Sequence, residues 1–309
     1  MMRFVNLKKG LVLTFVVLLL CISIFSCSKK SPVEEARKFI GNGKYRDALF
    51  VIKHYFKRGG ERSPELLFLA GISYLKLGIE SDASESFEEC ISRDKRWAGK
   101  IAEIYSKEVA RAVEKKKLAK AKRMIAEAIH FNPGVDFGRY NVIAGNVLME
   151  QRSDSLAVVY FERYMLAHPD TSGISRVMLD LATCYENMGD TTKAVEMCRN
   201  LITRFPKSQL RSSAEWKLEN LLYEKALGAF NAGQADEARL MLEEIVSSSK
   251  NPVIKEKAYF LLGRIYERLG DRDKAIRFYR EVVNLNLGSS SRLLEKAKER
   301  IEELEVSKN

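Results

Sequence analysis

The chain has 309 residues, of which 46% are hydrophobic and 30% are charged. This balance is ordinary for a folded protein and excludes a chain too polar to form a core. Its 52 basic and 41 acidic residues give a formal net charge of +11. An excess of this size favours contact with anionic lipid or with an acidic partner.

The first residues have the pattern of a signal peptide. Arg3, Lys8 and Lys9 precede an uncharged run, and Leu11–Phe25 is strongly apolar. A basic start followed by a short apolar core is typical of a secretory signal, which we expect to span residues 1–26. An uncleaved transmembrane anchor is the alternative, although the run is barely long enough to span a bilayer.

The end of this segment reads Ile24-Phe25-Ser26-Cys27. It resembles the processing site of bacterial lipoproteins. The resemblance implies cleavage before Cys27, a diacylglycerol on its thiol and a lipid anchor. Ser28, and not aspartate, follows the cysteine. By the sorting rule of lipoproteins in two-membrane bacteria, this implies the outer membrane, facing the periplasm, or the cell surface in a single-membrane bacterium. Nucleic acid is therefore not an expected partner.

A repeat follows the signal segment. The same position recurs as an alanine seven times, and three of these alanines are followed twelve residues later by Pro133, Pro169 or Pro206. We expect two antiparallel helices per unit, with a glycine ending the first helix and proline starting the next unit. The alanines are Ala48, Ala83, Ala121, Ala157, Ala194, Ala238 and Ala275, and a glycine stands five residues before most of them, at Gly43, Gly78, Gly189, Gly233 and Gly270.

Small and large residues alternate at further repeat positions. We expect the small residues to allow close approach of two helices and the large ones to fill the grooves between units. The small residues, twelve before the shared alanine, are Gly71, Gly145, Ala182, Ala226 and Gly263; the large ones, four after it, are Phe87, Phe161, Leu242 and Tyr279.

This pattern resembles the tetratricopeptide repeat (TPR), most closely in residues 181–206 and 261–286. The resemblance covers about residues 29–288 and implies an all-α superhelical solenoid of about six to seven helix-turn-helix repeats. We expect the solenoid to occupy residues 27–288. The unit near residue 102 is degraded, because Val109 and Ala112 replace its small residue and tyrosine. An insertion near residues 209–218 lengthens the helix that contains Trp216.

Residues 289–309 carry one apolar stripe, formed by Leu294, Ala297, Ile301 and Leu304, with charges opposite. We expect a helix that caps the last repeat. A partner-binding tail is the alternative.

In the TPR family the first helix of each unit lines the concave face. The resemblance therefore implies an apolar groove that suits an amphipathic helix or an extended peptide. The candidate partner-binding residues are Phe68, Ile72, Val142, Asn146, Leu179, Thr183, Tyr223, Leu227, Phe260 and Arg264.

No chemistry-bearing motif stands out. The three histidines do not show metalloprotease spacing, no paired-cysteine motif occurs, and no nucleophile elbow or phosphate-binding loop is present. We expect no enzyme, no cofactor and no metal site. Cys184 and Cys198 stand fourteen residues apart; we expect buried thiols, with a disulfide between them as the alternative.

Residues 100–123 hold nine basic and three acidic residues, including Lys115-Lys116-Lys117. A solvated helix face is the favoured interpretation, and a patch for lipid headgroups or an acidic partner is the alternative.

The signal segment, Cys27 and the repeats together resemble the TPR lipoprotein of the outer-membrane β-barrel assembly machinery. Phe205-Pro206-Lys207-Ser208 resembles a repeat junction of that family. The expected function is a membrane-anchored protein-interaction scaffold in the cell envelope, in outer-membrane protein assembly. The alternative is a periplasmic adaptor for peptidoglycan, polysaccharide export or secretion machinery.

Overall fold

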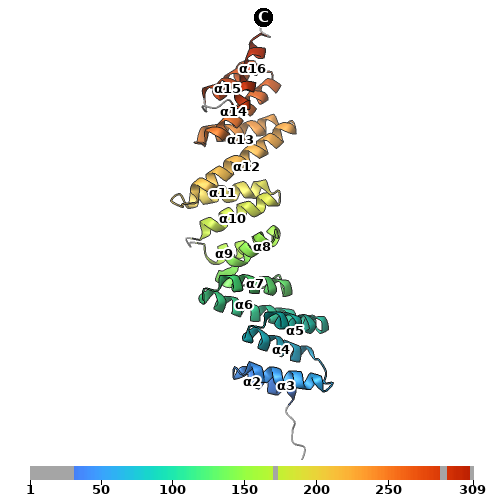
Figure 1. Ribbon diagram of the computed structural model, residues 1–309. Coiled ribbons are helices and arrows are strands. Elements are labelled where there is room, and N and C mark those ends of the chain that lie inside the picture. Colours follow the sequence, from blue (N-terminus) through green and yellow to red (C-terminus); the bar gives the residue numbers. More distant parts are fainter. Residues whose placement is uncertain (1–30, 170–172, 286–290, 307–309) are drawn as a thin grey trace, which may run out of the picture. The chain divides into compact units, whose positions relative to one another are not determined.

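The computed structural model describes residues 31–169, 173–285 and 291–306, and all regular structure in these ranges is helical (Figure 1). Seven successive helix pairs are followed by one last helix in this part of the chain, which confirms the expected all-α repeat fold. The pairs are α2 (Pro32–Gly41) with α3 (Tyr45–Lys57), α4 (Pro64–Leu77) with α5 (Glu80–Arg93), α6 (Ala98–Glu114) with α7 (Leu118–Phe131), α8 (Asn141–Glu150) with α9 (Asp154–Ala167), α10 (Ile174–Asn187) with α11 (Thr191–Arg204), α12 (Arg211–Asn231) with α13 (Ala235–Ser248), and α14 (Pro252–Arg268) with α15 (Arg272–Asn284); the last helix is α16 (Arg292–Val306).

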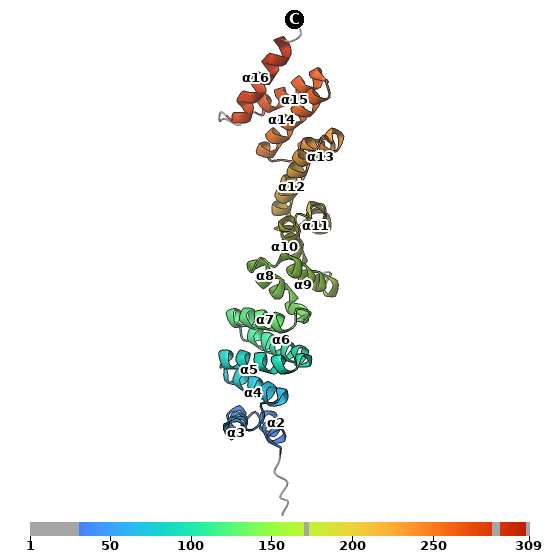
Figure 2. The same ribbon diagram turned by 90° about the vertical axis from the view of Figure 1, so that its right-hand side faces the viewer.

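The helices belong to two compact units, which meet in the sequence at Val135 and Asp136. The first unit holds α2–α7 and the short 3₁₀ helix η1 (Lys95–Trp97). The second unit holds η2 (Gly138–Tyr140) and α8–α16. Within each unit, helices that are neighbours in the sequence lie side by side, as Figures 1 and 2 show. Each repeat therefore builds its core mainly against the repeats next to it.

A pair of positions sixteen residues apart joins the two helices of each repeat. A Cβ atom added at Gly71 would lie 2.4 Å from the Phe87 ring, and one added at Gly145 would lie 2.5 Å from the Phe161 ring. Such distances are too short for real contacts, so only glycine admits the aromatic ring. The expected small and large positions thus meet within one repeat.

The other repeats carry different pairs of residues at the same two positions. Where the first helix carries alanine, the second carries Ile, Cys or Leu, and the third repeat pairs two branched residues. All members of these pairs are at most 1% exposed: Ala36 with Ile52, Val109 with Ile125, Ala182 with Cys198, and Ala226 with Leu242. The third repeat, which matched the pattern least well, still folds as α6 and α7.

Left-handed turns connect the two helices of each repeat. The five predicted turn glycines have φ between +71° and +82°. In the third and fourth repeats the same place is taken by Lys116, with φ of +57°, and Arg152, with φ of +60°. A side chain in this conformation costs roughly 1–2 kcal/mol. These two repeats therefore adopt the common turn against the preference of their residues.

Helix ends follow the sequence signals in part. Asp190 accepts a hydrogen bond from the Lys193 N–H at 3.0 Å, and Asp271 accepts one from the Lys274 N–H at 3.1 Å, so both residues are N-caps of second helices. The remaining second helices begin at residues whose side chains make no capping bond. Tertiary packing, and not capping, must therefore set the start of most second helices.

The insertion near residues 209–218 lengthens α12, as expected. This helix has 21 residues and begins after the Arg204–Leu210 connection. Trp216 lies in its first half and is 59% exposed.

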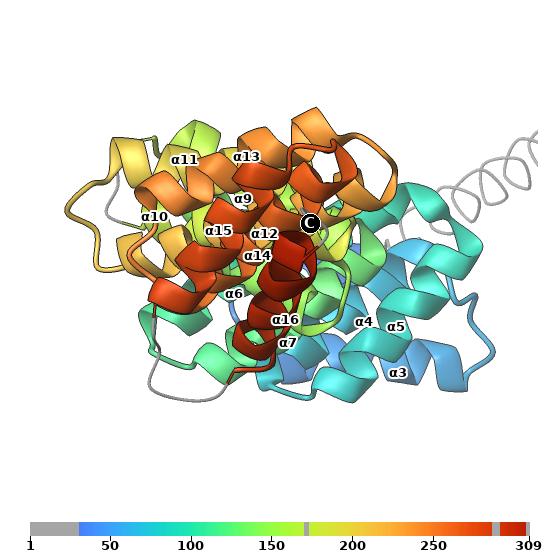
Figure 3. The same cartoon turned by 90° about the horizontal axis from the view of Figure 1, so that it is seen from above.

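The last helix, α16, packs against α15 and α14 (Figure 3). Ala297 is buried, while the other stripe residues are half-buried. Arg300 forms an ion pair with Glu267 of α14, and Arg280 of α15 donates to Glu305 at 2.8 Å. The apolar stripe and these ion pairs hold α16 against the seventh repeat, so the expected capping helix is confirmed.

The volume shared across a repeat generates a stability test. Gly145→Ala should destabilise the fold by about 1–3 kcal/mol, because the new methyl group meets the Phe161 ring. Adding Phe161→Leu gives the fourth repeat the alanine–leucine pair that Ala226 and Leu242 form in the sixth. The double variant should therefore lose less free energy of unfolding than the two single variants lose together. Urea unfolding followed by circular dichroism measures these differences.

Gly228→Ala is the matched control, because Gly228 lies inside α12 with no atom within 4 Å of an added Cβ. This variant should be more stable than the parent by about 0.5–1 kcal/mol. Equal effects of Gly145→Ala and Gly228→Ala would contradict the proposed packing.

Candidate functional site

The two candidate groove residues of the first unit lie on α4. The Phe68 ring is half-buried, with ring centroids 4.7 Å from Trp97 and 6.0 Å from Phe87. Ile72 is 8% exposed. Both side chains therefore bury much of their surface in contacts within the unit.

The eight candidates of the second unit lie on the first helices of four successive repeats. They come in pairs one turn apart on α8, α10, α12 and α14, and all are half-buried except the exposed Arg264. The Arg264 guanidinium lies 4.9 Å from the centre of the Phe230 ring, and the Lys257 ammonium lies 5.7 Å from that of Tyr223. Burial raises the pKa of Tyr223. These first helices thus present apolar and aromatic surface that is accessible in part.

Two neighbouring recesses of the second unit lie where α10 faces the start of α12 and the connection before it. One cavity of about 570 Å³ is lined by Leu179 and Thr183 of α10 and by Trp216 of α12, among others. A second of about 790 Å³ is lined by the connection between α11 and α12. Arg176 lines both cavities. We call the two together the Trp216 cleft, lined by Ser175, Arg176, Leu179, Asp180, Thr183, Arg204, Phe205, Pro206, Lys207, Ser208, Gln209, Leu210, Ser212, Ser213, Trp216 and Lys217.

The cleft exists because α10 and α12 do not pack closely. Like the pairs α4 with α6 and α8 with α10, the first helices α10 and α12 make few backbone contacts with each other, and they are joined mainly through the second helix between them, α11. The Arg204–Leu210 connection and the lengthened start of α12 occupy the region instead. Of the predicted groove residues, the cleft includes Leu179 and Thr183. The groove prediction missed Trp216, although the insertion signalled that its helix is unusual.

The charges of the cleft are mostly positive. Arg176, Arg204, Lys207 and Lys217 line it, against the single carboxylate of Asp180. Arg176 lies 4.0 Å from Asp180, yet burial raises the pKa of that carboxyl above its ordinary value. Lys217 forms an ion pair with Glu186. The lining therefore keeps an excess of positive charge.

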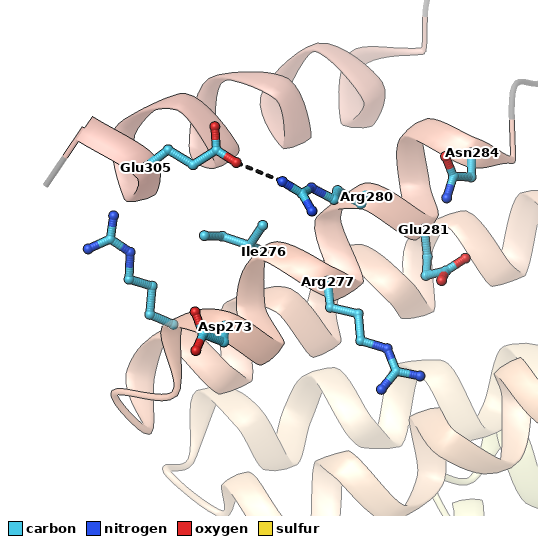
Figure 4. Close-up of a pocket in the computed structure, with 8 residues that line it drawn as sticks. Asp273, Ile276, Arg277, Arg280, Glu281, Asn284 and Glu305 are labelled. Carbon is cyan, nitrogen blue, oxygen red and sulfur yellow. Dashed lines mark hydrogen bonds and ion pairs between the residues drawn. The ribbon is translucent and has the colours of Figure 1, made fainter. Parts of the chain in front are cut away.

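A different cavity, of about 460 Å³, lies between α15 and α16 (Figure 4). Arg280 and Glu305 join across it, and the Ile276 side chain extends into the space between the helices. The lining balances three arginines with three carboxylates: Arg272, Arg277 and Arg280 with Asp273, Glu281 and Glu305. This balance offers no preference for a charged ligand.

The basic segment at residues 100–123 is partly neutralised within the first unit. Lys120 and Arg123 lie 3.7 Å and 3.1 Å from the Glu80 carboxylate, and Arg111 pairs with Glu108. Lys115-Lys116-Lys117 is exposed at the turn between α6 and α7. This arrangement fits a solvated helix face.

Chemistry-bearing residues do not converge in the described ranges. Histidine, cysteine and acidic side chains there form no group of three or more that would hold a metal ion. None of the described helices combines the length and apolar character needed to cross a bilayer. Cys27 and the signal segment lie outside the described residues.

The three cysteines of the repeats are free and buried. Burial raises the pKa of the Cys90 and Cys198 thiols to about 11 and that of Cys184 to about 12. The Cys90 thiol also donates to the Pro64 carbonyl at 3.1 Å. Cys184 and Cys198 are not joined by a disulfide, so each packs as a small apolar residue.

These thiols should be unreactive in the folded protein. At pH 8, well below their raised pKa values, a maleimide should leave Cys90, Cys184 and Cys198 unmodified, and should modify all three after urea unfolding without reductant. Peptide mass spectrometry measures each site separately. Failure of Cys184 and Cys198 to react after unfolding would instead indicate a disulfide.

Comparison with known protein families identifies two of the repeats. Residues 176–208, which span α10 and α11, match a family model of the tetratricopeptide repeat, and residues 256–289, which span most of α14 and α15, match a second. No curated protein sequence matches the chain significantly.

Several solved structures align with the chain at low identity. The C-terminal part of a TPR repeat-containing protein from Cytophaga hutchinsonii is 14% identical, with a TM-score of 0.39, over 87% of this chain and 99% of that one. A tetratricopeptide repeat protein from Parabacteroides merdae is 16% identical, with a TM-score of 0.30, over 88% and 97%. PilF of Pseudomonas aeruginosa is 16% identical, with a TM-score of 0.30, over 79% and 97%.

Three observations agree on the type of repeat. The helices form pairs joined by left-handed turns, small residues on one helix face large residues on the other, and two segments match models of the tetratricopeptide repeat. Arrays of this kind act as surfaces for holding other proteins. The chain contains tetratricopeptide repeats at residues 176–208 and 256–289, and its other helix pairs share their architecture.

Proposed function

We propose that the protein is a lipoprotein of the bacterial cell envelope that holds other envelope proteins against its repeats. One observation carries the interaction role: the first helices of four successive repeats in the second unit present half-buried apolar and aromatic side chains in a row. Side chains of this kind bind the apolar face of a helix or the alternate side chains of an extended peptide. The location rests on the sequence before α2.

Cys27 is the proposed point of attachment to the membrane. It stands five residues before Pro32, where α2 begins. An extended chain advances at most about 3.6 Å per residue, so α2 would begin within about 18 Å of the lipid-bearing residue. Several acyl chains hold a protein firmly, because each buried CH₂ contributes about 0.8 kcal/mol. The first repeat would then work close to the membrane surface.

Outer-membrane protein assembly is the process we favour, on the likeness of the signal segment, Cys27 and the repeat junctions to the assembly lipoprotein. An adaptor for peptidoglycan, polysaccharide export or secretion machinery is the second candidate. Both functions use the same anchor and the same kind of repeat surface. They differ in the partner, which is a barrel-assembly subunit in the first case and a synthase or a secretin in the second.

Cys27→Ala tests the anchor. In its own cells the parent chain should incorporate labelled palmitate and sediment with membranes, whereas the variant should carry no label, because the acylated thiol is missing. Label and membrane attachment that persist in Cys27→Ala would exclude lipidation at this residue. Cys90→Ala is the matched control and should behave as the parent does.

A photo-crosslinking residue at Thr183 tests the partner. Thr183 is half-buried on α10, and Leu240, which is 61% exposed on α13, provides the comparison site. A crosslink to a barrel-assembly protein should form at Thr183 and not at Leu240. Mass spectrometry of the crosslinked product identifies the partner. Capture of wall synthases or export components would support the adaptor function in place of the assembly function.

A further inference from the structure

We propose that the Trp216 cleft binds an acidic peptide segment of a partner protein, with one apolar side chain of that segment seated beside Trp216. This inference rests on the proposed role as a protein-interaction scaffold and names the chemistry of the partner segment. The site lies at the α11–α12 connection and the lengthened start of α12, and it extends the row of groove positions at Leu179 and Thr183.

The cleft has a fixed apolar floor. Leu179, Phe205 and Leu210 are half-buried and pack against a buried cluster of Ile174, Met178, Leu201 and Ala214. A floor supported in this way loses little conformational entropy when a ligand binds.

Trp216 stands exposed beside this floor. A tryptophan that is 59% exposed leaves a large apolar area in contact with water. Tryptophan is among the residues that contribute most to binding energy when a partner covers them. A single apolar side chain of a peptide, placed between Trp216 and Leu179, would remove this area from water. The geometry thus favours one apolar anchor over a long apolar stretch.

The charge of the cleft selects an acidic partner. Arg204 keeps its guanidinium 5.5 Å from the centre of the Phe205 ring, at the edge of the floor. Lys207 is exposed and pairs with no carboxylate of the described residues. Arg176 is exposed beside the part-buried Asp180. Carboxylates that flank the apolar anchor would therefore meet cations on more than one side, which is charge complementarity.

The remaining cavities do not share this excess. In the cavity between α15 and α16, arginines and carboxylates are equal in number. In the cavity of about 260 Å³ between α5 and α7, Arg123 lies 3.1 Å from Glu80 and Glu127 adds a second carboxylate. Unlike these two cavities, the Trp216 cleft combines a positive lining with an exposed aromatic ring.

A recess also favours a peptide over a bilayer. Tryptophan with basic residues occurs at membrane interfaces too. However, the apolar lining here is recessed between two helices and a connection, where a side chain can enter and a flat lipid surface cannot. We therefore assign the cleft to a peptide and keep the bilayer as an outcome of the test.

Peptide binding by the purified full-length chain in detergent tests the proposal. The probe is a short amidated peptide with a central phenylalanine flanked by glutamates. One control peptide replaces the phenylalanine with serine, and another replaces the glutamates with lysines. Anisotropy of a fluorescein label gives the affinity. In a Trp97→Phe background, Trp216 is the remaining tryptophan, and its emission should shift to the blue when the unlabelled peptide binds.

Matched variants locate the binding site. Trp216→Ala should weaken binding about thirty-fold, as expected for a buried hot-spot tryptophan. Lys207→Gln should weaken it about two- to five-fold and reduce its sensitivity to salt. Leu240→Ala and Lys250→Gln remove an exposed apolar residue and an exposed cation outside the cleft, and should leave the affinity unchanged. All variants should keep the helical circular dichroism of the parent.

Three results would overturn the assignment: no binding of the glutamate-flanked peptide, equal binding of either control peptide, or equal binding by Trp216→Ala. A blue shift of Trp216 with vesicles that contain phosphatidylglycerol, and not with the peptide, would assign the cleft to a bilayer. The assay needs neither the lipid on Cys27 nor the envelope. A failed anchoring result would therefore leave the peptide result standing, and failure of the peptide to bind would leave the anchor standing.

Discussion

The fold depends on the space shared between two residues sixteen positions apart in each repeat. Glycine admits a phenylalanine or tyrosine ring, alanine admits an aliphatic residue or cysteine, Val109 stands opposite Ile125, and every member of these pairs is almost fully buried. Interiors are close-packed, so the two residues together, and not either one alone, decide how closely the two helices of a repeat approach. The left-handed turn then needs only to reverse the chain across that distance.

The same constraint leaves another distance free. The shared volume fixes α10 against α11 and α12 against α13, but it does not fix α10 against α12. There the Arg204–Leu210 connection and the lengthened start of α12 take the place of direct contact, and a positively lined recess results. The recess thus arises where this longer connection and helix start meet α10, while the core of each repeat is kept.

Most of the architecture was predictable from the sequence because its signals are local. The recurring alanines and the turn glycines locate the helices and the turns between them. The expectation that proline starts the next unit is wrong for Pro133, Pro169 and Pro206, because each lies two residues after the end of a second helix and the next first helix begins five to eight residues later. The candidate groove residues could be placed on first helices, but their exposure could not. Phe68 turns toward Trp97, and Trp216 remains exposed, because both outcomes depend on the separation of neighbouring repeats. The periodicity of a single sequence does not predict the distance between neighbouring repeats.

The turns at Lys116 and Arg152 have a consequence for how the molecule opens. Both residues hold a conformation that glycine adopts without steric cost, and both lie in the two repeats beside the Val135–Asp136 boundary of the units. In a linear array, stability is close to a sum over repeats and their neighbours, so a local penalty stays local. Among the turns inside the repeats, those at Lys116 and Arg152 are therefore where amide hydrogens should exchange first and where a protease should cleave first.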